Sequence, residues 1–366
     1  MTIARGARGR ASMTPIPGGG FGGDVAAGRY ERTSLAVVEA AYRLHQPADA
    51  WLRDVAVAAQ PALDHGMGVL SVTFRVDASG ALRFEDTSTA GAPPSWILTQ
   101  LRGDSEGLSR RDVHESWGHP APLETTSSAY KRVYDVPFNE WTLFGPWRER
   151  GVQDGLVAKV MDPSGSGFLM FAPLRQVSHP DPLDQARWRR VMTHVVAGLR
   201  LRRAALLDDD GDAVLDPAGR VLHAETDARS RTARDALRDA AVTVDRARSR
   251  AGRRDPDAAL KAWQGLVSGR WSLVDRFDRD GRRFLVARRN DPSVARPAGL
   301  SDRERQVVGY AVLGYSNKHI AYALGLAQST VSNHLRAAMR RMGVRHLSAL
   351  REIVHADEIR EARDEP

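Results

Sequence analysis

The sequence lacks several residue types and patterns, and each absence narrows the class of protein. None of its 366 residues is a cysteine, which excludes disulfides, thiolate metal sites and cysteine nucleophiles. No apolar run approaches the roughly 18 residues that a membrane helix needs. No apolar segment follows the N-terminal arginines as it would in a signal peptide. We therefore expect a cytoplasmic protein that contacts no membrane.

Motifs of common catalytic sites are also missing. The sequence contains no H-E-x-x-H, no G-x-x-x-x-G-K-[ST] and no G-x-S-x-G. His114 and His119 are close in sequence, but Gly118 and Pro120 beside them indicate a loop and not the metal-binding face of a helix. We predict that the protein is not an enzyme and holds neither a metal nor another cofactor.

Lysine is scarce, so that arginine supplies nearly all of the positive charge behind a net charge of +8. A positive balance favours a polyanionic partner. The excess is concentrated at residues 296–350, which contain eight basic residues and only two acidic ones, Asp302 and Glu304. Neutralisation of phosphates supplies most of a protein's non-specific affinity for DNA, so this segment predicts double-stranded DNA as the partner.

The same segment has the start and stop signals of a bundle of short helices. Ser301 and Glu304 have the S-x-x-E spacing of a capping box, which predicts a helix start. Ser316 can cap a second helix, and Gly325 allows a tight turn into a third, over about residues 327–342. Further glycine stops and the start of a fourth helix are predicted at Gly314, Gly343 and His346. Two helices joined by a glycine turn, the second of them basic, are typical of a helix-turn-helix.

These residues resemble the DNA-binding domain of LuxR/FixJ-type bacterial transcriptional regulators. The resemblance is carried by Leu300-Ser301-Asp302-Arg303-Glu304, Gly314-Tyr315-Ser316-Asn317-Lys318-His319-Ile320-Ala321, Thr330-Val331-Ser332-Asn333-His334-Leu335 and Met342-Gly343-Val344. It implies an all-α domain of four helices, in which the third helix reads DNA and the fourth helps to form a homodimer.

The resemblance also implies roles for individual residues. Base contacts would come from Ser332, Asn333 and Arg336. Contacts to the DNA backbone would come from Lys318, Thr330, His334 and Arg340. The dimer helix would use Leu347, Leu350, Ile353 and Val354.

Two positions depart from the family pattern. Ala327 stands where the family usually has a capping Ser or Thr, so either Gln328 or Ser329 substitutes or the helix start shifts. Ser332 stands where a longer basic or amide residue is common, which leaves the base preference open.

Four strand-turn-strand patterns lie upstream, each with Asp at the first and Gly at the fourth position of its turn. This spacing is typical of a β-hairpin with a left-handed residue at its end. The turns are residues 77–80, 162–165, 216–219 and 278–281, and helical patterns precede the first of them at 35–42 and 51–58. Because the hairpins flank helical segments twice, we predict an α+β fold: two antiparallel-sheet domains, each with helices on one face, before the helical C-terminal domain.

The two sheet domains resemble GAF domains (the first) and small PAS-like domains (the second) in pattern and order, which implies a sensor of a small molecule or a protein. The expected organisation is a disordered tail at 1–30, a GAF-like domain at 31–182, a connecting helix at 183–206, a PAS-like domain at 207–291, a linker at 292–299, the DNA-binding domain at 300–358 and a tail at 359–366. The connecting helix would either dimerise and carry the signal or simply cover the first sheet.

An aromatic cluster marks one candidate ligand site. Its members are Trp96, Trp117, Tyr134, Trp141 and Phe144. Aromatic residues can line an apolar pocket for a small molecule, but they pack into cores equally well.

Taken together, the sequence predicts a sequence-specific DNA-binding transcriptional regulator with N-terminal sensory domains. Two alternatives remain. Residues 300–342 also resemble the fourth region of RNA polymerase sigma factors, so the chain could be a sigma-like partner of RNA polymerase. It could also be a signalling or interaction protein whose helical bundle does not read sequence.

Overall fold

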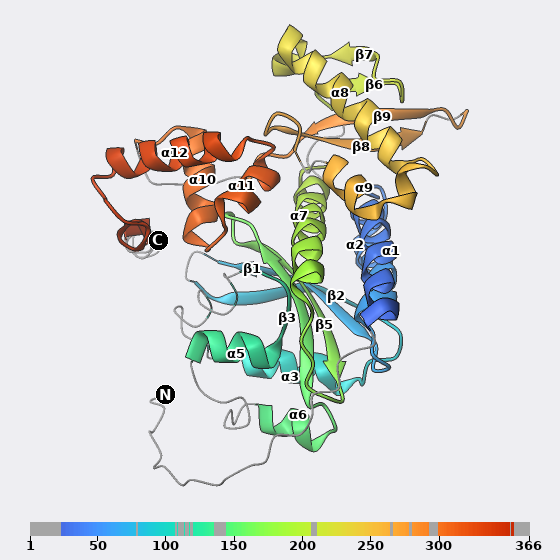
Figure 1. The fold of residues 1–366 in the computed structure, drawn as a ribbon, viewed down its shortest axis with the longest axis vertical. Coiled ribbons are helices and arrows are strands. Elements are labelled where there is room, and N and C mark those ends of the chain that lie inside the picture. Colours follow the sequence, from blue (N-terminus) through green and yellow to red (C-terminus); the bar gives the residue numbers. More distant parts are fainter. Residues whose placement is uncertain are drawn as a thin grey trace.

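The computed structural model describes residues 23–77, 80–106, 108, 113, 117, 120–134, 144–205, 211–263, 266–277, 280–292, 299–351 and 353–354. These residues form two antiparallel sheets with their helices and a helical C-terminal domain (Figure 1). The α+β fold class predicted from the sequence is confirmed. Within the described ranges, no helix combines the length and hydrophobicity needed to cross a bilayer.

The first sheet has five strands in the order β2-β1-β5-β4-β3. The strands are β1 (Val69–Val76), β2 (Leu82–Ala90), β3 (Ala121–Thr125), β4 (Asp154–Met161) and β5 (Ser166–Leu174). The hairpins β1–β2 and β4–β5 are the first two that the sequence predicts. Strand β3 was not predicted, because its five residues include Pro122, and a short strand with proline is tolerated only at a sheet edge.

Both faces of this sheet are covered. Phe168 and Met170 of β5 pack on one face, against α1 (Gly23–Ala41), α2 (Ala48–Leu63) and α7 (Pro182–Ala205). Leu169 and Phe171 pack on the other face, with α3 (Trp96–Ser105) and α6 (Gly145–Glu149). The expectation of helices on a single face is therefore wrong for this sheet. The physical signal was present in the sequence, since a continuous apolar strand is typical of burial on both sides.

The second sheet has four strands in the order β7-β6-β9-β8. They are β6 (Ala213–Leu215), β7 (Val221–Ala224), β8 (Trp271–Phe277) and β9 (Arg283–Arg289). Between β7 and β8 lie the 3-10 turns Thr226–Arg229 and Gly252–Arg254 and the helices α8 (Arg231–Arg248) and α9 (Pro256–Ala262). Helix α8 packs Ala233, Leu237 and Ala241 on the sheet. Alanines supply much of this contact.

The predicted Asp-to-Gly turns close the hairpins. The amides of Gly80, Gly165 and Gly219 donate to the carbonyls of Asp77, Asp162 and Asp216 at 2.8–3.0 Å. These glycines and Gly281 have φ between 75° and 82°, the left-handed conformation that favours glycine.

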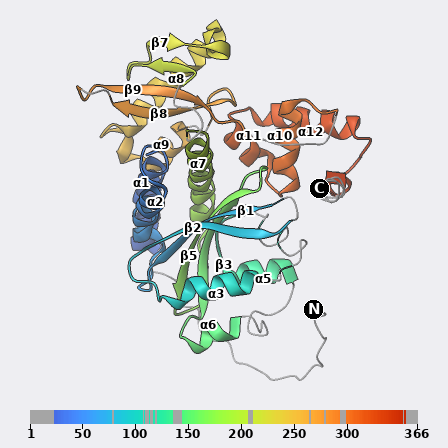
Figure 2. The same cartoon turned by 180° about the vertical axis from the view of Figure 1, so that it is seen from behind.

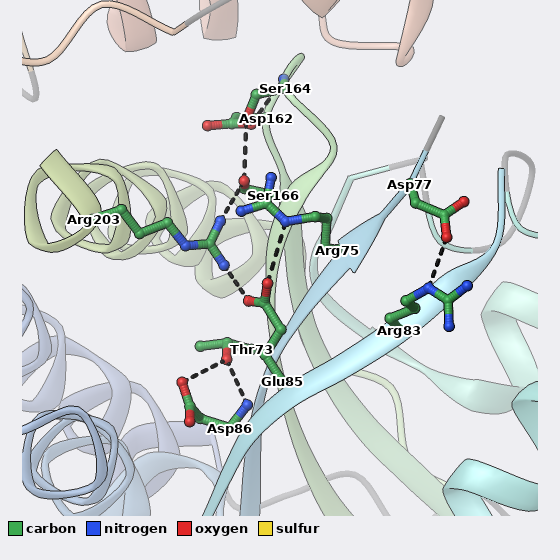
Figure 3. A network of polar contacts seen from close by, with 10 residues as sticks. All are labelled: Thr73, Arg75, Asp77, Arg83, Glu85, Asp86, Asp162, Ser164, Ser166 and Arg203. Carbon is green, nitrogen blue, oxygen red and sulfur yellow. Dashed lines mark hydrogen bonds and ion pairs between the residues drawn. The ribbon is translucent and has the colours of Figure 1, made fainter. Parts of the chain in front are cut away.

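Helix α7 lies at the centre of the molecule, between the first sheet and α1 (Figures 1 and 2). Its apolar residues Trp188, Val191 and Val195 are buried in the core beside α1 and the sheet. This packing favours the covering role over a dimer contact through these residues. Arg203 near its C-terminal end donates to Ser166 and to Glu85, and Glu85 also pairs with Arg75 at 3.2 Å (Figure 3).

Helix α1 begins at Gly23, before residue 30, where the sequence predicts that a disordered tail ends. Alanines at this point favour helix. Residues 1–22 lie outside the described part of the chain, as do most of the predicted linker and the predicted C-terminal tail.

The C-terminal domain contains α10 (Asp302–Val312), α11 (Asn317–Leu324) and α12 (Gln328–Arg341). A further helical segment begins at residue 347, as predicted for the fourth helix. A core of Val308, Val312, Ala338 and Leu350 holds the first, third and last of these helices together.

Candidate DNA-binding interface

The helix-turn-helix is built by local signals that the structure confirms. The Ser301 hydroxyl accepts from the amide of Glu304, and the Glu304 carboxylate accepts from the amide of Ser301 at 2.9 Å, which completes the capping box of α10. Arg341 pairs with the same carboxylate and so ties the end of α12 to the start of α10. The backbone hydrogen bond from Ser301 is the main cause that lowers the pKa of Glu304 below its ordinary value.

Helix α11 begins and ends at predicted residues. Ser316 caps it by accepting from the amide of His319 at 3.3 Å. Gly325 ends it in the left-handed conformation, with φ 61° and ψ 38°. Helix α12 starts at Gln328, so the helix start is not shifted, and Ala327 leaves the N-cap without a side-chain hydrogen bond.

The three residues predicted to contact bases all lie on α12. Asn333 and Arg336 are exposed, and the Arg336 guanidinium donates to the Asn333 side-chain oxygen at 2.7 Å. Ser332 is half-buried: its hydroxyl donates to the Gln328 carbonyl at 3.1 Å and accepts from the Asn317 side chain at 3.1 Å. Asn333 and Arg336 thus present their polar ends to solvent, whereas Ser332 ties α12 to α11.

The residues predicted to contact the DNA backbone lie on α11 and α12. Lys318 is exposed in the first turn of α11, and Arg340 is exposed near the end of α12. Thr330 and His334 are half-buried on α12. Along the chain, Lys318 and Thr330 precede Asn333, His334 lies between Asn333 and Arg336, and Arg340 follows.

The predicted dimer residues divide into two pairs. Leu350 and Val354 are buried in the core of the C-terminal domain, 0% and 8% exposed. Leu347 and Ile353 are half-buried. Only the second pair has apolar surface left for a partner.

The described members of the predicted ligand cluster pack into the core on one face of the first sheet. Phe144 stacks on Trp147 with ring centroids 5.4 Å apart, and Trp96 meets Trp147 edge-on at 5.2 Å. Trp117 lies against Phe74 at 5.2 Å. Trp141, the side chain of Tyr134, and the pair His114 and His119 lie outside the described residues.

Sequence reasoning missed that α11 is packed against the upstream domains. Its Tyr322 hydroxyl lies 2.6 Å from Nε2 of His194 on α7 and donates to the carbonyls of Leu260 and Trp263 at 3.0–3.1 Å. His194 in turn meets the Tyr42 hydroxyl at 3.0 Å through Nδ1. A tyrosine on the outer face of a short helix was the available signal for such a contact.

A second polar contact joins the same two helices. Nε2 of His319 lies 2.7 Å from the Thr193 hydroxyl, which itself donates to the Arg189 carbonyl at 2.8 Å. With that hydroxyl proton on the Arg189 carbonyl, Nε2 of the neutral His319 ring serves as the donor to the Thr193 oxygen. Burial lowers the pKa of both His194 and His319 to about 3, so both are neutral at pH 7.

The C-terminal domain matches a known family. The family model described as "Bacterial regulatory proteins, luxR family" matches residues 298–354, which span α10, α11, α12 and the start of the last helix.

Two solved structures align with most of the chain, with low TM-scores and low sequence identities. A crystal structure of Escherichia coli SdiA gives a TM-score of 0.31 and 11% identity over 88% of this chain and 94% of that one. A structure of SdiA in complex with octanoyl-rac-glycerol gives 0.26 and 10%, over 89% and 86%. The family match and the helix geometry show that the chain carries, at residues 298–354, a DNA-binding domain of the luxR family of bacterial regulatory proteins.

Proposed function

We propose that the chain is a sequence-specific DNA-binding transcription regulator whose helix α12 reads the major groove. The single observation that carries the proposal is the exposed polar face of α12, with Asn333 and Arg336 beside each other on a luxR-family domain. An arginine can bind guanine and an asparagine can bind adenine with two hydrogen bonds each. Their mutual hydrogen bond would be exchanged for bonds to base edges.

The flanking polar residues would hold the domain on the duplex. Lys318 and Arg340 are exposed and positively charged, and Thr330 and His334 lie between them in sequence. Contacts to phosphates fix the register of a DNA-binding helix but carry no sequence information. Binding should therefore weaken with salt, whereas its sequence preference should depend on Asn333 and Arg336.

The functional unit on DNA would be a homodimer on a two-part site. Leu347 and Ile353 of the last helix are half-buried, which leaves apolar surface for a second copy. Twofold-related recognition helices require two half-sites at a fixed spacing. Light scattering with and without DNA tests this point, and a monomer in both would contradict it.

The two upstream sheet domains would act as the sensor, of GAF-like and PAS-like kind. Helices α7 and α9 of this part contact α11 directly, which gives a physical route from an upstream ligand to the DNA-binding domain. The signal would be a small molecule or a protein.

Selection of bound sequences from a random DNA library, with the full-length chain, tests the function. Wild type should recover a motif. Arg336→Ala should cost about 1–3 kcal/mol of discrimination at one position, whereas Lys318→Ala should weaken all sequences alike and flatten the salt dependence. Identical behaviour of the two variants would contradict the assigned roles. Recovery of no motif, with binding to core RNA polymerase, would favour the sigma-like alternative.

A further inference from the structure

A cleft of about 560 Å³ opens where the C-terminal domain meets the upstream part of the chain. Arg189 and Arg190 of α7 line it, together with Lys261 of α9 and Lys318 of α11. The volume falls within the roughly 300–1,000 Å³ typical of small-molecule sites. Three helices from different parts of the chain therefore bring four basic side chains to one cleft.

The charge of this cleft is unbalanced. The described residues that line it include no acid, and none of its four basic side chains forms an ion pair with a described residue. Asp257 is the acid that feels Arg190 and Lys261, but it is already bound: both of its oxygens accept from the Arg187 guanidinium, at 2.8–2.9 Å. Positive charges gathered in a concave site raise the local concentration of anions.

The rest of the lining is neutral and held in place. His319 and Tyr322 form part of the wall, and their hydrogen bonds to Thr193 and His194 fix the distance between α11 and α7. An anion in the cleft would meet basic groups from α7, α9 and α11 at once, on walls that need not rearrange. Pre-organisation of this kind favours binding.

We propose that this cleft is a binding site for phosphate groups, held by Arg189, Arg190, Lys261 and Lys318. Two sources fit the chemistry. One is a free, multiply charged phosphorylated molecule, which would bridge the sensor and the DNA-binding domain. The other is the DNA backbone beyond the helix-turn-helix, because Lys318 belongs to both surfaces; this second source rests on the proposed function.

The test uses the full-length chain and the double variant Arg189→Gln/Arg190→Gln. Arg231→Gln/Arg234→Gln is the matched control, since these exposed arginines of α8 give the same change of charge outside the cleft. Isothermal titration at low salt measures the binding of inorganic pyrophosphate and, as a larger probe of similar charge, ATP. A filter assay measures affinity for duplex DNA as a function of salt.

Three outcomes are distinguishable. If the probes bind wild type and the control, and the cleft variant binds them at least about tenfold more weakly with unchanged DNA affinity, the source is a free anion. If the probes do not bind, but the cleft variant loses DNA affinity and its salt slope falls by about 2 relative to the control, the source is the DNA backbone.

If the cleft variant and the control behave alike in both assays, the phosphate site is overturned. The library selection reports independently on the proposed function. A chain that binds pyrophosphate through the cleft but recovers no DNA motif would retain the site and lose the regulator assignment.

Discussion

Helices α11 and α12 are consecutive parts of one helix-turn-helix, yet they have different surroundings. Five of the eight residues of α11 are buried, among them His319 and Ile320, and its outer face lies against α7 and α9. Only Val331 and Ala338 are buried among the fourteen residues of α12. The upstream domains thus pack against α11, whereas α12, the proposed recognition helix, stays largely exposed.

Substitutions on the two helices should therefore have different consequences. A change on α12 should alter DNA contacts without moving the domain. A change on α11 should alter how the C-terminal domain packs on the upstream domains. The Asn317 side chain of α11 donates a hydrogen bond of 3.1 Å to the Ser332 hydroxyl of α12. A shift of α11 would therefore also move the face of α12 that carries Asn333 and Arg336.

Gly325→Ala should have the largest effect on the packing of α11. A Cβ at this residue would lie 2.1 Å from the Leu266 carbonyl oxygen, which is backbone and cannot rotate away, so α11 and the segment of Leu266 must move apart. The matched control is Gly343→Ala, because Gly343 has nearly the same conformation, φ 67°, with nothing within 4 Å of an added Cβ. The control should cost only the left-handed strain of about 1–2 kcal/mol. Hydrogen exchange in α7 and α11 should rise sharply in the first variant alone; equal rises would show that strain, and not the contact, decides.

Tyr322→Phe should loosen α11 by a smaller amount. The change leaves Nε2 of His194 and the carbonyls of Leu260 and Trp263 without the hydroxyl that they share. Unsatisfied buried groups of this kind cost about 1–3 kcal/mol. Faster amide exchange in α11, with α12 keeping its DNA affinity in the isolated domain, is the expected result. Unchanged exchange would mean that the hydroxyl network contributes nothing to docking.

Lower pH should act on the same contact. His194 and His319 have pKa values of about 3 while buried, and a released histidine returns to about 6.5. Between these values the released state binds protons that the docked state does not, so docking is strongest above pH 6.5 and weakens as pH falls. At pH 5 the loss is at most about 2 kcal/mol for each histidine that becomes exposed.

Amide exchange of α11, corrected for its intrinsic pH dependence, measures this effect. His319→Gln is the control, since an amide can still donate to Thr193 but does not titrate. Its docking should depend less on pH than that of wild type, and an unchanged pH dependence would place the effect elsewhere.

The elements that the sequence predicted well are those set by near neighbours. The capping box, the Ser316 cap and the stop at Gly325 depend on contacts within four residues, so their residue types suffice. The docking of α11 depends on pairs such as His319 with Thr193, 126 residues apart, and no local pattern encodes them. The aromatic cluster stayed ambiguous for another reason, because a core and an apolar pocket use the same side chains.

A substitution at the start of α12 should have a weaker effect than the changes on α11. Ala327 has the extended backbone of an N-cap, φ −71° and ψ 146°, and is exposed, so a serine hydroxyl could accept from an amide of the first turn without strain. Ala327→Ser should therefore stabilise the domain by about 0.5–1 kcal/mol, seen as a rise in the temperature of unfolding. Ala327→Val, which enlarges the side chain without a hydroxyl and is as poor an N-cap as alanine, is the control. Because the new bond lies within α12 and not against α7 or α9, amide exchange in the docked face of α11 should stay as in wild type. A change there would mean that the two helices respond as one body, and that their different surroundings do not separate their roles.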